Sequence, residues 1–397
     1  MPAVLITGAS VAGPALAFWL AREGWDVTVV ERHDELREEG QNVDVRHAGH
    51  EAVRRMGVED AVRAANTGEE GTEFVDGDGH AVASFPADGD DSATAELEIL
   101  RGELSRVVVE PTPDDVRWVF GDRIEGLDDT GDAVEVAFAS GDTGTYDLVV
   151  VAEGLRSSTR ELVFDDVEVD PLGADIAYLT IPRHDDDPPT WQWFNATGSR
   201  MVSLRPDNTG TTRAMLSSIT EPDGQAELDR PAQEALLRER FAGAGWQTQR
   251  ILDAMPGAPM YYESLAQVKA PSWSRGRVVL LGDAAWAPSP MAGLGASLAL
   301  IGPYVLAGEL ARTPDDPRAA AARYEEVLRP YVERVQELPP GTPRVAHPRT
   351  ELGVRVLRLG QKIAAGPLGS AVQAVVPSVP DDFELPDYGL QGERRGG

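Results

Sequence analysis

The segment Gly282-Asp283-Ala284-Ala285-Trp286-Ala287-Pro288 decides the fold of this chain, together with Gly293-Leu294-Gly295 a few residues later. It follows directly on Arg277-Val-Val-Leu-Leu281, a run with the composition of a buried strand. Asp283 is therefore presented where a buried strand ends, and its carboxylate can bind a chain of hydroxyl groups. The Gly-x-Gly turn leads into a helix, whose free backbone N–H groups can face an anion. Taken alone, the segment could also be an ordinary strand, turn and helix with Asp283 as the helix N-cap.

A second glycine-rich turn stands near the N-terminus. Val4 to Ile6 has the composition of a buried parallel strand, Gly8 to Gly13 opens a helix, and the next strand ends at Glu31. In a βαβ unit of this kind the helix end seats a pyrophosphate, and an acidic residue about twenty positions on binds a ribose. Glu31 favours a ribose without a 2′-phosphate. The pattern is imperfect because Ser10 replaces its middle glycine.

The third motif lies mid-chain, where the strand-like run Tyr146 to Ala152 leads into Glu153-Gly154-Leu155-Arg156-Ser157-Ser158-Thr159-Arg160. Together the three segments resemble the group A flavoprotein monooxygenases, the family of para-hydroxybenzoate hydroxylase and of tetracycline-modifying hydroxylases. That family has a dinucleotide turn, a central Asp-Gly segment and a Gly-Asp segment in this order. The resemblance spans roughly residues 1 to 390 and includes Leu100 to Leu104 and Trp273 to Arg277.

The chain departs from the family pattern at three positions. Ser10 stands for the second glycine, Glu153 for the usual Asp, and Trp286 for the His found in many members. Glu153 lies in the segment that the family associates with both flavin and NAD(P)H, so its replacement bears on nicotinamide handling. Trp286 is expected to place a large apolar surface near the flavin.

Composition limits the function further. The chain has 397 residues, enough for two domains with sizeable cores, and 42% hydrophobic residues, as in ordinary globular proteins. It contains no cysteine, which excludes disulfides, thiolate metal sites and a cysteine nucleophile. Its six histidines are scattered without a carboxylate at ligand spacing, so no metal site is predicted.

The formal net charge is −30, and the only lysines are Lys269 and Lys362. Such a chain offers no surface to neutralise phosphates, so nucleic acid is not an expected partner. The acidic surface can serve solubility alone, or it can be a halophilic adaptation in which salt screens self-repulsion. Because FAD and NAD(P)H are anions, arginines must be kept where they bind, and Arg46, Arg101 and Arg156 are the candidates.

The first residues lack the basic start of a signal peptide, and the uncharged stretch Ala284 to Gly308 is interrupted by prolines and glycines. We therefore expect no membrane span and a cytoplasmic protein. The predicted fold class is α/β, with a Rossmann-like FAD-binding domain assembled from separated segments, an inserted antiparallel-sheet substrate domain and a C-terminal helical segment. The expected limits are residues 1–70, 100–170 and 268–335 for FAD; 71–99 and 171–267 for substrate; and 336–397 for the C-terminal helices and tail.

Within the inserted domain, alternating apolar and polar residues predict antiparallel strands at 176–181, 190–194, 201–204 and 212–217, and a helical stretch at 231–254. Beyond Arg318 the composition predicts helix to about residue 376, followed by an extended tail from 377 to 390. No internal repeats are present.

The resemblance implies an FAD-dependent, NAD(P)H-consuming monooxygenase that hydroxylates an aromatic or polycyclic small molecule with dioxygen through a flavin C4a-hydroperoxide. It assigns the pyrophosphate to the first helix turn and the ribose to Glu31, while Arg32 packs on the adenine. Asp283 would bind the ribityl hydroxyls, and Arg101 would contact the flavin side of the cofactor. The implied cofactor-binding residues are Gly8, Ser10, Gly13, Glu31, Arg32, Arg101, Gly154, Arg156, Asp283, Pro288, Gly293, Leu294 and Gly295.

Three residues are candidates for catalysis: Arg46 and His47, in a segment that faces the flavin ring in this family, and Pro288 beside the ring. His47 would be a proton relay, although a lone surface histidine is the simpler interpretation. The candidates for the substrate cavity are Trp191, Trp193, Met201, Met215 and Tyr261. An aromatic stripe on a sheet can equally be core.

Other functions remain open from the sequence. A flavin reductase of the same fold, similar to prenyl-lipid reductases, would act without oxygen insertion, but those enzymes often carry a cysteine motif. A non-catalytic flavin- or ligand-binding protein is the alternative suggested by Glu153 and Trp286. A short-chain dehydrogenase, suggested by Thr7-Gly-Ala-Ser10, is excluded because neither lysine follows a tyrosine at Tyr-x-x-x-Lys spacing. A homodimer is also left open.

Overall fold

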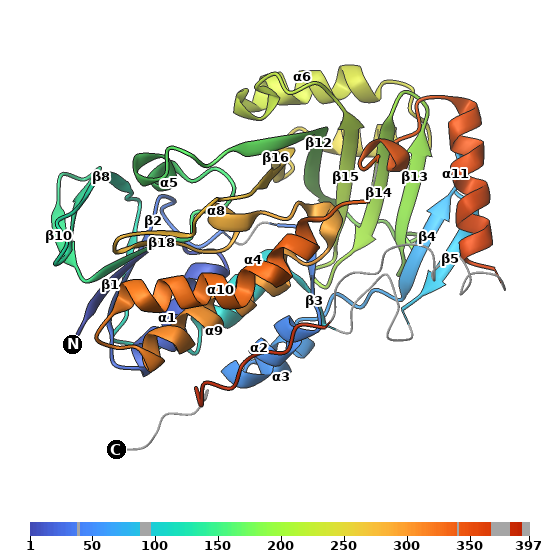
Figure 1. The fold of residues 1–397 in the computed structure, drawn as a ribbon. Helices are drawn as coiled ribbons and strands as arrows, with labels where there is room; N and C mark the ends of the chain where they lie inside the picture. The colour runs from blue at the N-terminus through green and yellow to red at the C-terminus, as the bar shows by residue number, and fades with distance from the viewer. Residues whose placement is uncertain (38–39, 88–96, 340, 367–381, 391–397) are drawn as a thin grey trace.

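The computed structural model describes residues 1–37, 40–87, 97–339, 341–366 and 382–390. Figure 1 shows a sheet on the left that is covered by α1 (Ala12–Arg22), α9 (Gly295–Arg312) and α10 (Pro317–Gln336). A second, larger sheet on the right is covered by α6 (Arg230–Phe241). The predicted α/β fold is confirmed.

The left-hand sheet has six strands in the order β17-β18-β11-β1-β2-β7. Its neighbours pair in parallel except for the edge strand β17. The strands are β1 (Ala3–Thr7), β2 (Asp26–Glu31), β7 (Arg117–Phe120), β11 (Leu148–Val151), β17 (Ser274–Arg275) and β18 (Val278–Leu280). Since β1, β11 and β18 are adjacent and parallel, the three sequence motifs that follow them meet at one edge of the sheet. Ligands of open parallel sheets bind at this edge.

The helices of this half form one continuous core with the sheet. Helix α9 packs against α1 and α10, and the Trp19 and Tyr304 rings meet edge to face at 5.3 Å. Burial on nearly every side explains why α9 is apolar all round. Within the described ranges, no helix has the length and apolarity needed to cross a membrane.

The right-hand sheet has seven strands in the order β16-β12-β15-β14-β13-β4-β5, antiparallel except for the β13–β4 pair. They are β4 (Gly71–Val75), β5 (Ala81–Pro86), β12 (Val169–Pro182), β13 (Trp191–Ala196), β14 (Arg200–Pro206), β15 (Thr211–Ile219) and β16 (Met260–Val268). The four predicted strands are therefore present, each longer than expected. One face of the sheet packs its alternate residues, such as Leu179, Val202 and Leu216, against Leu237 and Phe241 of α6.

Shorter elements complete the fold. The β3–β6 ribbon and the three-stranded sheet β8–β10 are β3 (Asn42–Val45), β6 (Leu97–Leu100), β8 (Ile124–Asp129), β9 (Val134–Phe138) and β10 (Thr143–Tyr146). The remaining helices are α2 (Ala48–Met56), α3 (Glu59–Ala64), α4 (Arg101–Val109), α5 (Ser158–Val163), α7 (Thr248–Ala254), α8 (Asp283–Trp286) and α11 (Glu351–Ala364), with 3-10 turns η1 (Gln225–Glu227), η2 (Pro290–Ala292) and η3 (Arg344–Ala346).

The C-terminal part of the chain differs from the prediction of one long helical stretch. Helix does not continue from 318 to 376, because the chain leaves the helix after Gln336 and resumes it only at Glu351. Pro339, Pro343 and Pro348 stand in this interval, and proline lacks the N–H that a helix interior requires. The part of the prediction that concerns 367–381 falls outside the described residues. The described part of the predicted tail, 382–390, has no helix or strand, and Tyr388 Oη donates to Glu309 Oε1 at 2.7 Å.

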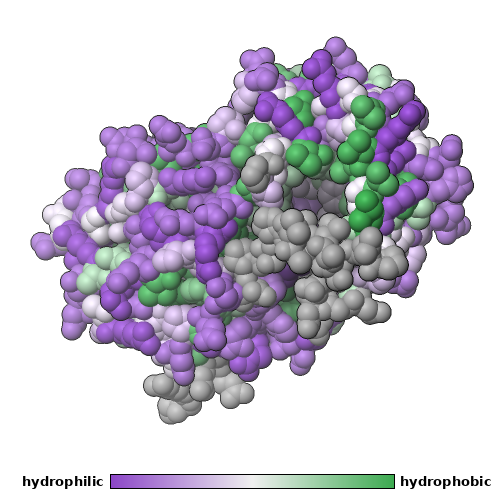
Figure 2. Space-filling view, turned by 45° about the vertical axis from the view of Figure 1, so that its right-hand side comes forward, coloured by the Kyte–Doolittle hydropathy of each residue, from purple (hydrophilic) through white to green (hydrophobic). Residues whose placement is uncertain are grey.

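Helix α11 lies beside β4 and β5 at the edge of the larger sheet (Figure 1). Its residues Leu352, Val356, Leu359 and Ile363 are exposed and spaced three or four positions apart, so they share one face. Figure 2 shows the resulting apolar strip on the surface over this helix.

Candidate functional site

A single cavity of about 1150 Å³ joins the two sheets. It begins at the strand ends of the parallel sheet and continues over the face of the larger sheet that α6 does not cover. Pockets for drug-sized ligands usually measure about 300 to 1,000 Å³. The cavity is therefore large enough for a dinucleotide and a second, smaller molecule together.

The N-terminal glycine-rich turn, Gly8 to Gly13, brings backbone close to the cavity. Gly8 has φ 98°, and a Cβ there would lie 2.5 Å from the Ala152 carbonyl oxygen. A Cβ at Gly13 would lie 1.9 Å from the Gly8 carbonyl oxygen, so α1 can start this close to the sheet only with glycine. Gly8 lines the cavity, whereas Gly13 lies beneath the turn.

Glu31 holds the same turn from the end of β2. Its Oε2 accepts the Ala9 N–H at 2.8 Å, and its Oε1 accepts the His33 N–H at 3.1 Å. Glu31 lines the cavity, as does Arg32, whose side chain is exposed at this end. The carboxylate is thus fixed at the place where a ribose is expected.

Ser10 and Arg101 come from different motifs and meet in the cavity wall. Arg101 Nη1 donates to Ser10 Oγ at 3.3 Å, and the Arg101 backbone N–H donates to Gln41 O at 3.0 Å. Burial, and then the neighbouring Arg37 guanidinium, lower the pKa of Arg101. An arginine nevertheless keeps its charge, so this wall presents a fixed cation.

Glu153 in the central motif is a scaffold residue. Its carboxylate accepts four hydrogen bonds, from Thr7 Oγ1 at 2.8 Å, Ser157 Oγ at 2.8 Å, Thr159 N at 3.0 Å and Thr159 Oγ1 at 2.6 Å. These bonds tie the end of β1 to the start of α5. Although Glu153 replaces the usual Asp, its carboxylate accepts all four of these hydrogen bonds from groups within the protein.

The residues after Glu153 reach the cavity and the Gly-Asp motif at Gly282 and Asp283. Gly154 lines the cavity with φ 82°, and Arg156 lines it while pairing with Glu227 at 3.0 Å. Arg160, which the sequence analysis did not nominate, is buried and donates to Ala284 O at 3.2 Å and to Leu155 O at 3.0 Å. It positions the central motif against the Gly-Asp motif.

Asp283 is the first residue of α8, and its carboxylate opens into the cavity. It does not cap the helix, because the N-cap residue is Gly282. Burial by the surrounding protein raises the pKa of Asp283 to about 6, and the Arg101 charge limits the rise. Within the described part of the chain, no group donates a hydrogen bond to this carboxylate. A ligand with hydroxyl groups would satisfy it.

The turn after α8 supplies the next part of the wall. Pro288, Gly293 and Gly295 line the cavity, and Leu294 is fully buried beneath them. Pro290, which the sequence did not indicate, also lines the cavity and is exposed, whereas Pro288 is buried. This turn brings the free N–H groups at the start of α9 to the cavity.

Trp286 does not lie where the resemblance implied. It is 1% exposed and packs against Trp273 at a ring distance of 4.4 Å and Tyr324 at 5.8 Å. A Cβ at Gly302 of α9 would lie 3.0 Å from its ring, so the side chain fills the core under α9. Trp286 therefore offers no surface to the cavity.

Two candidates for catalysis, Arg46 and His47, follow directly on β3, and only Arg46 lines the cavity. Arg46 lines the cavity and pairs with Asp44 at 2.9 Å, and its backbone N–H donates to Ser297 Oγ at 2.9 Å. His47 has φ 48° and is exposed outside the cavity. Because its side chain is not among those that line the cavity, its role as a proton relay stays a prediction without a cavity contact to support it.

All five substrate candidates line the cavity, on the face of the larger sheet opposite to α6: Trp191, Trp193, Met201, Met215 and Tyr261. The Trp191 and Trp193 rings are 4.4 Å apart. Tyr178 of β12 pairs with Tyr261 of β16 and widens this aromatic wall. Tyr178 was missed because two-residue periodicity does not tell which face of a strand is open.

The far end of the cavity carries a buried group of charges around Arg205. Its Nε lies 2.5 Å from Glu69 and its Nη2 lies 3.0 Å from Glu98 and 3.4 Å from Asp44, while its guanidinium stacks 4.0 Å from the Trp191 ring. Burial, together with the nearby Glu98 and Asp44 charges, raises the pKa of Glu69 to about 8. This end therefore has no unbalanced positive charge for an anionic ligand.

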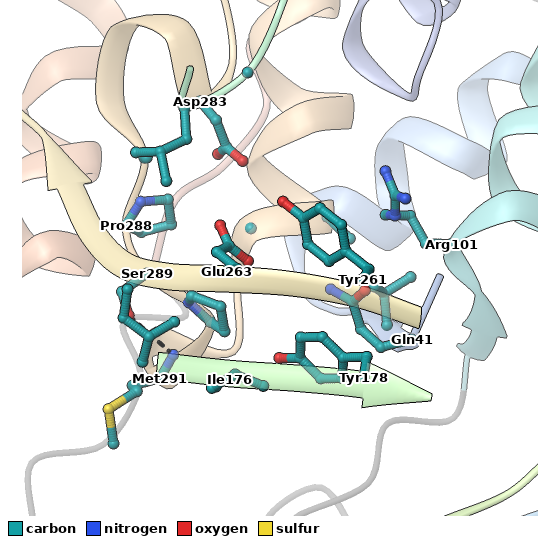
Figure 3. A pocket seen from close by; sticks show the side chains of 18 of the residues that line it. Gln41, Arg101, Ile176, Tyr178, Tyr261, Glu263, Asp283, Pro288, Ser289 and Met291 are labelled. Atoms are coloured by element: carbon teal, nitrogen blue, oxygen red, sulfur yellow. Dashed lines mark hydrogen bonds between the residues drawn. The ribbon is translucent and has the colours of Figure 1, made fainter. Parts of the chain in front are cut away.

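Glu263 is a further site residue that the sequence analysis missed. It lies on β16 with its carboxylate turned into the cavity between Pro288 and Tyr261, and Asp283 and Arg101 face the same space (Figure 3). Burial, and then the Asp283 charge, raise the pKa of Glu263 to about 7.

Elsewhere in the described residues, Asp76, Asp78 and His80 come close enough to share a metal ion. They lie in the exposed turn between β4 and β5, where Asp76 Oδ1 accepts the N–H groups of Asp78 and His80. These hydrogen bonds are those of a turn.

The residues around the cavity fit FAD. A close-approach glycine turn, a carboxylate fixed at the end of β2 and an unsatisfied carboxylate at α8 are spaced along one cavity, and Arg101 supplies positive charge between them. These are the groups that a pyrophosphate, a ribose and a ribityl chain require.

Comparison with known proteins agrees with this fit. Residues 1–337 match the protein family described as "FAD binding domain". The FAD-dependent monooxygenase asL4 of Sarocladium schorii is 36% identical over an alignment of 421 positions, which covers 97% of this chain and 97% of the other. Among solved structures, the tetracycline destructase Tet(51) is 31% identical with a TM-score of 0.81, covering 98% of this chain and 99% of the other.

A more distant structure shares the fold. Klebsiella pneumoniae HpxO, in complex with FAD and uric acid, has a TM-score of 0.75 at 21% identity and covers 94% of this chain and 95% of its own. From the family match and the close relatives, the chain belongs to the FAD binding domain family and is an FAD-dependent monooxygenase.

Proposed function

We propose that this monooxygenase consumes NAD(P)H and uses dioxygen to hydroxylate an aromatic or polycyclic small molecule, as the family resemblance implies. The observation that carries the proposal is the continuity of the cavity. The dinucleotide turn, Asp283 and the aromatic wall of Trp191, Trp193 and Tyr178 all line the same space. A planar substrate on that wall would therefore lie next to the flavin end of a bound FAD.

The residues have separate tasks in this proposal. The turn at Gly8 and Ser10 would hold the pyrophosphate, Glu31 the ribose, and Asp283 the ribityl hydroxyls. Arg101, fixed by Ser10, would compensate negative charge on the flavin side. When bound, reduced FAD supplies the electrons and activates dioxygen, and the protein supplies orientation and shields the reaction from water.

The substrate class is supported by the relatives and by the wall itself. Tet(51) is named as a tetracycline destructase, and HpxO was crystallised with uric acid; tetracyclines and uric acid both have fused rings. In this chain, stacked tryptophans and Met201 and Met215 provide a broad apolar surface. Such surfaces bind flat ring systems.

The test is to follow oxygen uptake and NADH or NADPH oxidation by the FAD-loaded protein, with and without a panel of phenols and polyketides. We expect oxygen uptake coupled to NAD(P)H oxidation, accelerated by at least one panel member that gains one oxygen atom. NAD(P)H oxidation that reduces a substrate without oxygen incorporation would identify a reductase instead. Tight FAD binding with no turnover across the panel would favour a binding protein.

A further inference from the structure

Glu263 is the cavity carboxylate that the proposed function does not use. It alternates with Tyr262 and Ser264 on β16, stands opposite Ile176 of β12, and projects into the cavity with Tyr261 (Figure 3). No hydrogen bond or ion pair joins its carboxylate to any residue that the structure describes.

The other carboxylates near the cavity have partners or an assigned ligand. Glu153 accepts four hydrogen bonds, and Glu69 is paired with Arg205. Asp283 is unsatisfied by the protein, but the ribityl chain of FAD would satisfy it. A shielded carboxylate without hydrogen bonds is costly in free energy. Because Glu263 stands on the strand next to Tyr178, its partner is expected from the substrate side.

The groups that face Glu263 come from every element around it. They are Asp283 of α8, Arg101 of α4, Arg156 before α5, Tyr261 of β16 and Tyr178 of β12. Burial and the Asp283 charge raise the pKa of Glu263 to about 7, against the opposing charges of Arg156 and Arg101. A group with its pKa near the working pH can take up a proton and release it again.

The charges around the cavity also restrict which substrate group can be the partner of Glu263. The arginines at the far end, Arg46, Arg205 and Arg213, are each paired with a carboxylate. An anionic substrate would therefore find no free guanidinium there and would meet the carboxylates of Glu263 and Asp283. A neutral ring with a weakly acidic hydroxyl fits both the aromatic wall and an acceptor at Glu263.

We propose that Glu263 is a further catalytic residue, which takes the proton from a phenolic or enolic hydroxyl of the bound substrate; the inference rests on the proposed function. The substrate O–H bond breaks, the proton passes to a Glu263 carboxylate oxygen, and the electron pair stays on the substrate oxygen. The resulting phenolate or enolate carries more electron density on its ring carbons. It is thereby activated toward the electrophilic oxygen that the monooxygenase reaction supplies, and Glu263 later returns the proton to product or water.

The experiment compares wild type with Glu263→Gln and with Glu263→Asp, all loaded with FAD and without NAD(P)H. The probe is 7-hydroxycoumarin, whose phenol and phenolate have separate absorption bands. FAD affinity, measured by fluorescence titration, and the melting temperature show whether each variant is intact. The bound probe is then titrated with pH.

We expect wild type to bind the probe as phenolate at a pH where the free probe is still protonated. Glu263→Gln should hold about tenfold less phenolate at the same pH, which corresponds to about one pKa unit, and Glu263→Asp should restore part of it. With a turned-over phenol, kcat/KM should lose its acidic limb in Glu263→Gln while FAD affinity stays unchanged.

Three results would contradict this. A probe bound as neutral phenol by wild type, or as phenolate equally by Glu263→Gln, would exclude Glu263 as the base. Absence of probe binding to FAD-loaded wild type would exclude the phenolic substrate class. Failure to bind FAD at all would instead contradict the proposed function itself.

Discussion

Ser10 Oγ accepts a hydrogen bond from Arg101 Nη1 at 3.3 Å, although the two residues are 91 positions apart in the chain. Ser10 stands where the dinucleotide pattern has its second glycine, and Arg101 begins α4. The departure from the pattern therefore has a structural use. It provides the hydroxyl that orients the arginine beside the cavity.

Replacing Ser10 by Gly should restore the usual motif and yet weaken FAD binding. A hydrogen bond of this kind contributes about 1 kcal/mol, which corresponds to roughly a fivefold loss in affinity. Fluorescence titration of the apoprotein with FAD measures the change, with Ser10→Thr as the control that keeps a hydroxyl. If Ser10→Gly binds FAD as tightly as wild type, the contact does not orient Arg101 for the cofactor.

Asp283→Ala should weaken FAD binding far more than Glu31→Gln. Asp283 has no hydrogen-bond donor among the described residues, so its carboxylate is free for the ligand, whereas Glu31 is partly engaged by Ala9 and His33. Loss of a buried, charge-assisted hydrogen bond costs about 1.5 to 3 kcal/mol, or roughly ten- to a hundredfold in affinity. Equal losses in the two variants, measured by FAD titration, would reject the role of Asp283.

Ser289 should tolerate glycine better than alanine. Its φ of 80° and ψ of 146° place a non-glycine residue in a region of strained backbone, and its Oγ accepts the Met291 N–H at 3.3 Å. Such strain costs about 1 to 3 kcal/mol. Ser289→Gly relieves the strain and loses one hydrogen bond, so the melting temperature should stay equal or rise. Ser289→Ala loses the bond and keeps the strain, so its melting temperature should fall. The opposite order would show that the turn is not strained.

Glu69 should make stability depend on pH. Its pKa is raised from 4.5 to about 8 in the folded protein. Between pH 4.5 and about 8 the folded state therefore keeps a proton on Glu69 that the unfolded state has lost. Stability linked to Glu69 is therefore present at low pH and is lost as the pH rises from 4.5 to about 8. Glu69→Gln cannot ionise and should lack this loss. Urea unfolding at a series of pH values measures both proteins, and parallel pH profiles would contradict the assignment.

Salt should stabilise the folded protein. The net charge of −30 creates self-repulsion, which is screened over about 10 Å at 0.1 M salt and over about 3 Å at 1 M. The melting temperature of the FAD-bound protein should therefore rise from dilute buffer to molar KCl. A flat or falling melting temperature would leave the acidic surface as a solubility feature only.

The sequence predicted the fold class and the meeting of three motifs because these follow from local rules. A strand followed by a glycine turn is recognisable at β1, and adjacent parallel strands necessarily end at one edge. The sheet β8–β10 was not predicted, since its strands are short and only residues such as Val134 and Val136 are buried.

The rest of the site depended on packing between distant segments. On β16 the alternation of Tyr261, Glu263 and Leu265 with Tyr262 is visible in the sequence, but only the position of α6 decides which set packs under that helix. Trp286 was misplaced for the same reason. Its motif position indicates the flavin, whereas α8 turns its ring toward α9.

The two faces of the larger sheet have different neighbours, so adjacent residues on one strand have different roles. On β12, Ala177 and Leu179 anchor the sheet to the helical layer, while their neighbours Ile176 and Tyr178 face the cavity. Substitutions at the cavity-facing positions therefore change the substrate wall without removing the contacts with α6. A combinatorial library confined to those alternate positions of β12 to β16 would vary that wall while the layer under α6 stays the same.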